Sequence, residues 1–101
     1  MLQLLAQLQL DAGQLEDAHR HIAASLMARP DHAPSLLVAG GVARAQGRLA
    51  DAAHALSQAA ALAPANDKAW FELALVRQDL RDFDGAAEAL RQLLRVAPLT
   101  T

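Results

Sequence analysis

The chain of 101 residues lacks cysteine and tyrosine and has only one tryptophan and two phenylalanines. Without cysteine there is no disulfide framework and no thiol chemistry. Nine basic residues stand against eleven acidic ones, so neither a basic surface for nucleic acid nor an acidic tail is present. No apolar run reaches the ~18 residues of a membrane span. Neither nucleic acid nor a membrane is therefore expected as a partner.

The first ten residues are apolar but are interrupted by Gln3, Gln7 and Gln9. They carry no basic flank and no small-residue cleavage site, both of which a secretory signal peptide needs. The segment therefore predicts no signal peptide, and we expect a cytoplasmic protein.

Residues that could carry catalysis or bind a metal are scattered. The chain contains no GxxxxGK[ST], GxSxG or HExxH motif. Four histidines occur without cysteine or a tight carboxylate set, so no metal shell is expected. Ser25, Ser35 and Ser57 have no evident base beside them in the sequence. We expect no enzyme activity and no cofactor.

What the chain does contain is an internal repeat. Pro30, Pro64 and Pro98 stand 34 residues apart. The same interval relates Ala18, Ala52 and Ala86, and also Ala6, Gly40 and Ala74. A fixed period of this length indicates one supersecondary unit copied along a solenoid.

The pattern within each unit predicts two helices. Gly13 and Gly47 lie in short polar turns between apolar-periodic stretches, and the prolines close the second stretch of each unit. Asp31 and Asn66 are expected as N-caps, because their side chains can accept orphan amide hydrogens. Six helices follow, over approximately 1–12, 15–28, 33–46, 49–62, 67–80 and 83–96.

The repeat resembles the tetratricopeptide (TPR) motif, which reads W-x2-L-G-x2-Y, A-x3-F and P. The third unit matches best, with Trp70-x2-Leu73-Ala74, Ala86-x3-Leu90 and Pro98. The tyrosine slot departs from the motif, since it holds Gln9, Ala43 and Arg77, and thinner packing is expected there. The resemblance implies an all-α fold, a right-handed α-solenoid of three helix–turn–helix repeats with six antiparallel helices. It implies a single domain over 1–101, with repeats at approximately 1–32, 33–66 and 67–98.

The resemblance also implies a concave groove lined by the first helix of each unit. Apolar groups in such a groove suit an extended peptide or an amphipathic helix, and Gly41 would let a ligand backbone come near. The expected lining is Gln3, Gln7, Leu10, Asp11, Leu37, Gly41, Arg44, Ala45, Lys68, Phe71, Leu75, Gln78 and Asp79.

Some members of this family clamp the C-terminal carboxylates of heat-shock chaperones with lysine, asparagine and arginine. Lys68 matches one clamp lysine. The other four slots hold Gln3, Gln7, Val38 and Glu72, and a carboxylate at the arginine slot argues against that clamp.

Three functions are compatible with these features. The preferred one is a protein–protein interaction scaffold that binds a peptide or helix segment. The second is an auxiliary domain of a larger bacterial enzyme of the glycosyltransferase, sulfotransferase or hydroxylase type. The third is a self-assembly unit joined through its terminal helices. Phe83, Leu94 and Val96 lack an expected cover, which indicates a piece of a longer protein or a self-associating one.

Overall fold

A computed structural model describes residues 2–96 and contains the six expected helices, with ends within about a residue of those predicted. Pro98 and its neighbours lie outside the described residues. The helices are α1 (Leu2–Asp11), α2 (Leu15–Ala28), α3 (Ala33–Ala45), α4 (Leu49–Leu62), α5 (Asp67–Asp79) and α6 (Phe83–Val96). None of these helices has the length and apolar character needed to cross a membrane.

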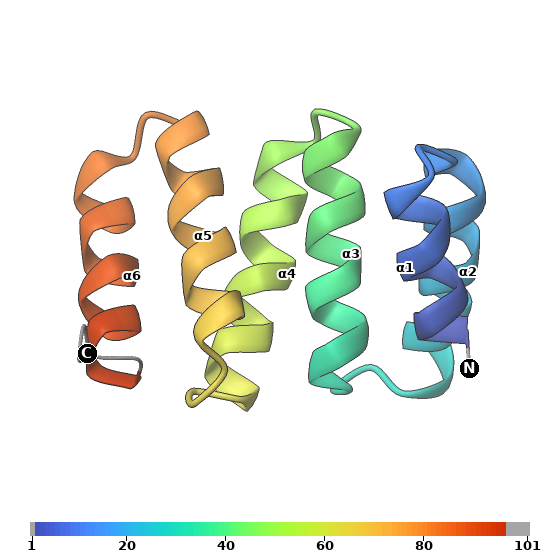
Figure 1. The fold of residues 1–101 in the computed structure, drawn as a ribbon, viewed down its shortest axis with the longest axis horizontal. Coiled ribbons are helices and arrows are strands. Elements are labelled where there is room, and N and C mark those ends of the chain that lie inside the picture. The colour runs from blue at the N-terminus through green and yellow to red at the C-terminus, as the bar shows by residue number, and fades with distance from the viewer. Residues whose placement is uncertain (1, 97–101) are drawn as a thin grey trace.

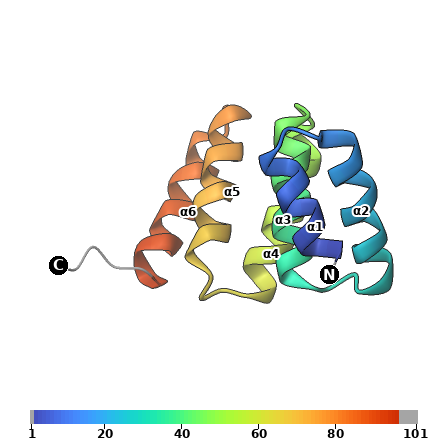
Figure 2. The same ribbon diagram turned by 45° about the vertical axis from the view of Figure 1, so that its right-hand side comes forward.

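Consecutive helices run antiparallel and stack into a row 36 Å long (Figure 1). The helices α1 and α2 lie at one end of the row and α6 lies at the other, as the turned view also shows (Figure 2). Contacts join α1 to α3 and α3 to α5, so the first helices of the three units form a continuous wall. This confirms an all-α helical-repeat solenoid.

The core consists of clusters that join neighbouring units. Ala6 and Ala18 pack together with Val38 and Val42, so the first pair of helices is sealed by α3. The Trp70 side chain packs between two clusters and donates its indole N–H to the Pro64 carbonyl at 2.9 Å. Small residues at the contacts within a pair let the helices approach closely, as the sequence predicts.

The tyrosine slot is filled by polar side chains in two units. The Gln9 Oε1 atom lies 2.7 Å from His21 Nδ1, and Arg77 Nη1 donates to the Gly85 carbonyl at 3.0 Å. Hydrogen bonds between the helices of a pair thus replace part of the missing aromatic packing.

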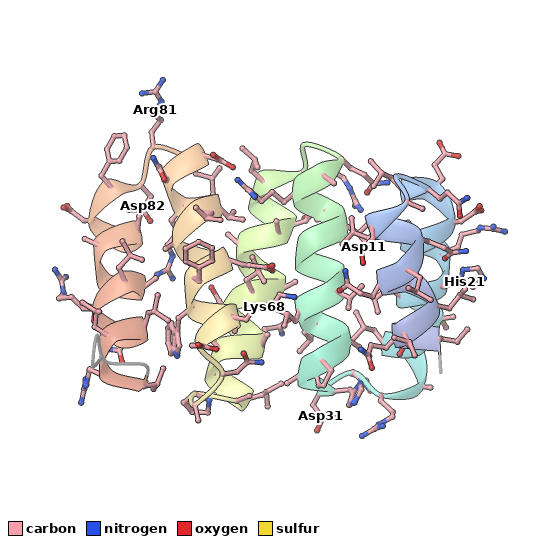
Figure 3. All side chains as sticks on the ribbon, in the orientation of Figure 1. Asp11, His21, Asp31, Lys68, Arg81 and Asp82 are labelled. Carbon is pink, nitrogen blue, oxygen red and sulfur yellow. The ribbon has the colours of Figure 1, made fainter. Side chains whose placement is uncertain are left out.

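The turn within each unit needs a left-handed residue. Gly13 and Gly47 have φ values of 80° and 79°, and Arg81 takes the equivalent position at 65°. Glycine adopts this conformation at no steric cost, whereas a residue with Cβ is strained there. Arg81 extends from its turn away from the helices (Figure 3). The third unit therefore keeps the turn geometry without the glycine that the other two units use.

One expected N-cap is confirmed and the other is wrong. Asn66 caps α5, because its side-chain oxygen accepts the Lys68 amide hydrogen at 3.1 Å. The cap residue of α3 is His32 and not Asp31. The helix begins at Ala33, with Pro34 in its first turn, and Asp31 lies one residue outside the cap position.

Candidate functional site

A hollow of about 390 Å³ lies along the wall made by α1, α3 and α5. Most of its lining comes from these three helices, and α4 contributes one leucine. The lining residues, which we call the central hollow, are Leu10, Gly40, Gly41, Arg44, Ala45, Leu56, Glu72 and Asp79.

Two consecutive glycines on α3 keep the central hollow open. A Cβ atom at Gly40 would lie 2.5 Å from Leu56 Cγ, so only glycine fits against that buried leucine. A Cβ atom at Gly41 would meet Leu10 alone, with its Cδ2 at 3.0 Å. Gly40 is therefore required by packing within the unit. Gly41 instead leaves bare backbone facing the hollow.

Charged side chains meet across the central hollow. Arg44 Nε on α3 lies 3.0 Å from Asp79 Oδ2 on α5. Both side chains are partly exposed, so this ion pair adds little to stability. Glu72 has no hydrogen bond or ion pair among residues 2–96. Burial raises the pKa of its carboxyl, and the more distant charges of Lys68 and Arg44 oppose that rise.

Replacing Glu72 with glutamine is expected to raise the melting temperature at pH 7. Because burial raises the folded-state pKa above the unfolded value, the native protein binds more protons between the two values. Stability therefore falls as pH rises through that window, which begins near the ordinary glutamate value of about 4.3. Thermal melts should show that glutamine raises the melting temperature at pH 7 and that this difference vanishes at about pH 3.5, where the glutamate is also neutral.

Glu88→Gln provides the matched control. The hydrogen bond from Arg91, at 2.9 Å, holds the Glu88 pKa below its ordinary value, and the hydrogen bond from Gln92 adds to this effect. This variant should not become more stable at pH 7. An equal gain in both variants would mean that glutamine helps for reasons unrelated to burial of a charge.

The expected groove residues divide between several places. Leu10, Gly41 and Arg44 line the central hollow, together with Ala45 and Asp79. Phe71, Leu75 and Gln78 line a second hollow between α5 and α6, and Lys68 lies beside Phe71 in a smaller one.

The remaining expected residues contribute in other ways. Gln3 and Gln7 are half-buried on α1, where Gln7 donates to Asp11 at 2.9 Å. Leu37 packs against two core clusters. A change at Leu37 therefore affects stability as well as any binding.

The Glu72 carboxylate lines the central hollow, whereas the sequence places it only at the arginine slot of the chaperone clamp and not in the expected groove lining. A signal was available, because the equivalent positions of the first two units hold Leu4 and Val38. A single carboxylate in an otherwise apolar register position indicates a special local role.

The expectation that no base lies beside the serines is wrong for Ser35. His32 Nδ1 lies 2.7 Å from Ser35 Oγ, and Ser25 Oγ lies 2.9 Å from the same atom. Ser35 is fully buried at the start of α3, so these contacts satisfy a hydroxyl that has no access to water.

Stacked antiparallel helical pairs with a hollow along one wall define the class of helical-repeat proteins. Two models described as tetratricopeptide repeat match the chain, one over residues 4–67 and the other over residues 43–100. The chain therefore belongs to the tetratricopeptide repeat family.

Solved structures share this fold. MamA matches with a TM-score of 0.91 and 24% identity, over 96% of this chain and 57% of that one. The Sgt2 TPR domain from Aspergillus fumigatus matches with a TM-score of 0.90 and 23% identity, over 97% of this chain and 65% of that domain. The first TPR of Spaghetti (RPAP3), bound to the HSP90 peptide SRMEEVD, matches with a TM-score of 0.91 and 17% identity, over 98% of this chain and 79% of that one. This chain thus spans less than two thirds of the length of MamA and of the Sgt2 TPR domain. No match was found among curated proteins.

Proposed function

We propose that the chain is a protein-interaction scaffold and that its central hollow receives a segment of a partner protein. The observation that carries this proposal is the convergence at Gly41. Bare backbone, the apolar Leu10 and the polar groups of Arg44 and Glu72 meet there from three different helices. An apolar surface with a few converging polar groups is typical of ligand sites.

The similar structure that holds an HSP90 peptide supports a peptide as the class of ligand. The ligand expected here has different chemistry. The carboxylates of Glu72 and Asp79 lie in the central hollow and repel acidic side chains such as those of SRMEEVD. Arg44 offsets only one of the two, since it is paired with Asp79.

Gly41→Leu should abolish this binding and leave the fold intact. Leucine fills the central hollow and is a better helix former than glycine. The probe is a phage-displayed library of random 12-residue peptides, selected on the unaltered protein. Fluorescence polarisation with an enriched peptide should then show at least a tenfold loss of affinity in the variant.

Ala61→Leu is the control, since it adds a leucine at an exposed position of α4 that does not line the central hollow. It should bind the selected peptide with unchanged affinity. Equal binding by Gly41→Leu, or failure to enrich any peptide, would overturn the proposal. An auxiliary role in a larger enzyme stays a prediction, because nothing between residues 2 and 96 bears on it.

A further inference from the structure

Within the chain, each later unit inserts its first helix into a slot made by the preceding pair. Ala39 and Val42 of α3 pack with Ala18 and Ile22 of α2 in one core cluster. One unit further along, α5 places Leu73 and Val76 against Ala52 and Leu56 of α4. The two contacts are related by the 34-residue interval, so the same docking is used twice.

A third slot of the same kind lies between α5 and α6, and no helix among residues 2–96 fills it. It is a hollow of about 390 Å³, mostly apolar. Leu90 is 43% exposed there, whereas the equivalent Leu56 is 0% exposed beneath α5. The lining, which we call the terminal slot, is Phe71, Ala74, Leu75, Gln78, Phe83, Ala86, Ala87 and Leu90.

The opposite end of the molecule carries the matching face. Leu5 and Leu8 on α1 are 41% and 59% exposed. Their equivalents on α5, Leu73 and Val76, are 1% and 0% exposed because the preceding pair covers them. No charged residue lies between Leu2 and Leu10, so the Leu5–Leu8 face carries no charge that would oppose insertion into an apolar slot.

We infer that a second copy of this chain docks head-to-tail, with the Leu5–Leu8 face of its α1 in the terminal slot. The occupant follows from the two internal contacts, since the slot accepts the first helix of a unit through apolar residues at these register positions. Among the six described helices, α1 is the first helix that no preceding pair covers. One molecule cannot fill its own slot, because α1 and α6 lie at opposite ends of the row (Figures 1 and 2).

A contact between different surfaces of two copies is heterologous and can propagate into longer chains. This association therefore goes beyond peptide binding in the central hollow and uses a different surface. Self-association and peptide binding can be tested separately, because Gly41→Leu blocks the central hollow and leaves both ends of the molecule unchanged.

Sedimentation velocity with two single-ended variants tests the arrangement. The head variant carries Leu5→Glu and Leu8→Glu, and the tail variant carries Phe83→Glu and Ala87→Glu. Both blocked ends have the same sign of charge, so they cannot attract each other. The unaltered protein should grow in mean mass with concentration, and each variant alone should remain monomeric. An equimolar mixture should stop at twice the mass of one chain, because only one pair of open ends exists.

Three results would overturn the proposal. They are an unaltered protein that stays monomeric up to millimolar concentration, a mixture that stays monomeric, and a single variant that still dimerises. The last result would indicate an isologous contact between two heads or two tails. Circular dichroism confirms that each variant retains its helices.

A second measurement does not depend on introducing charges. The chain lacks cysteine, so Leu8→Cys and Ala87→Cys each introduce one thiol. The internal contacts place the equivalents of these residues, Val76 and Ala53, in one core cluster. Mild oxidation should give a covalent dimer from the mixture in several-fold excess over either variant alone. Equal yields from all three samples would contradict the head-to-tail arrangement.

Discussion

Leu56→Ala is expected to lower the free energy of unfolding by about 2–5 kcal/mol, the range for deleting a buried leucine. The Leu56 side chain is fully buried and belongs to the cluster that joins α3, α4 and α5. It also packs against Gly40, so its removal leaves a cavity that rigid helices on several sides cannot easily close. Urea unfolding followed by circular dichroism measures the change.

Leu90→Ala is the matched control, since Leu90 occupies the same register position one unit later and is partly exposed. At protein concentrations too low for association, Leu90→Ala should lower the free energy of unfolding clearly less than Leu56→Ala does. Equal losses in the two variants would mean that α5 does not shield Leu56, and would contradict the packing between the second and third units.

The helices and the contacts within each pair could be predicted because they depend on local patterns. Each unit repeats a breaker and two small residues, such as Ala18 and its equivalents, at fixed offsets. The start of α3 could not be fixed as well, since Asp31 and His32 stand side by side and Pro34 is tolerated in the first turn from either start. The left-handed conformation of Arg81 could not be predicted either, because arginine rarely adopts a positive φ and its presence does not indicate one.

The candidate site was predicted less well than the fold. Register alone assigns Phe71 and Leu10 to one groove, yet they line different hollows. The difference arises because Leu10 faces a neighbouring unit and Phe71 faces a slot that no described helix covers. Which side of a helix is covered depends on its neighbours in space, and the register of a single helix does not contain that information. The half-buried carboxyl of Glu72 is a similar case, since its environment comes from several helices.

Gly40→Ala and Gly41→Ala are expected to change stability in opposite directions, although they are neighbours in one helix. Each substitution gains about 1 kcal/mol of helix propensity. At Gly40 the new methyl would lie 2.5 Å from the Cγ of buried Leu56, and overpacking of this kind costs about 1–3 kcal/mol. At Gly41 it meets only the Cδ2 of Leu10, the end of a side chain that can rotate. Urea unfolding should therefore show a net loss for Gly40→Ala and a gain for Gly41→Ala.

The cause of the loss at Gly40 can be isolated by a double-mutant cycle with Leu56→Ala. Once Leu56 is shortened, the atom that obstructs the new methyl is gone, and the methyl occupies part of the cavity. Gly40→Ala should then be neutral or stabilising in that background, and its coupling energy with Leu56→Ala should be about 1–3 kcal/mol in favour of the double variant. Gly41→Ala should be additive with Leu56→Ala, because its nearest neighbour is Leu10. Additivity at both glycines would mean that Gly40 is not held by its contact with Leu56, and the close pairing of α3 with α4 would have to be revised.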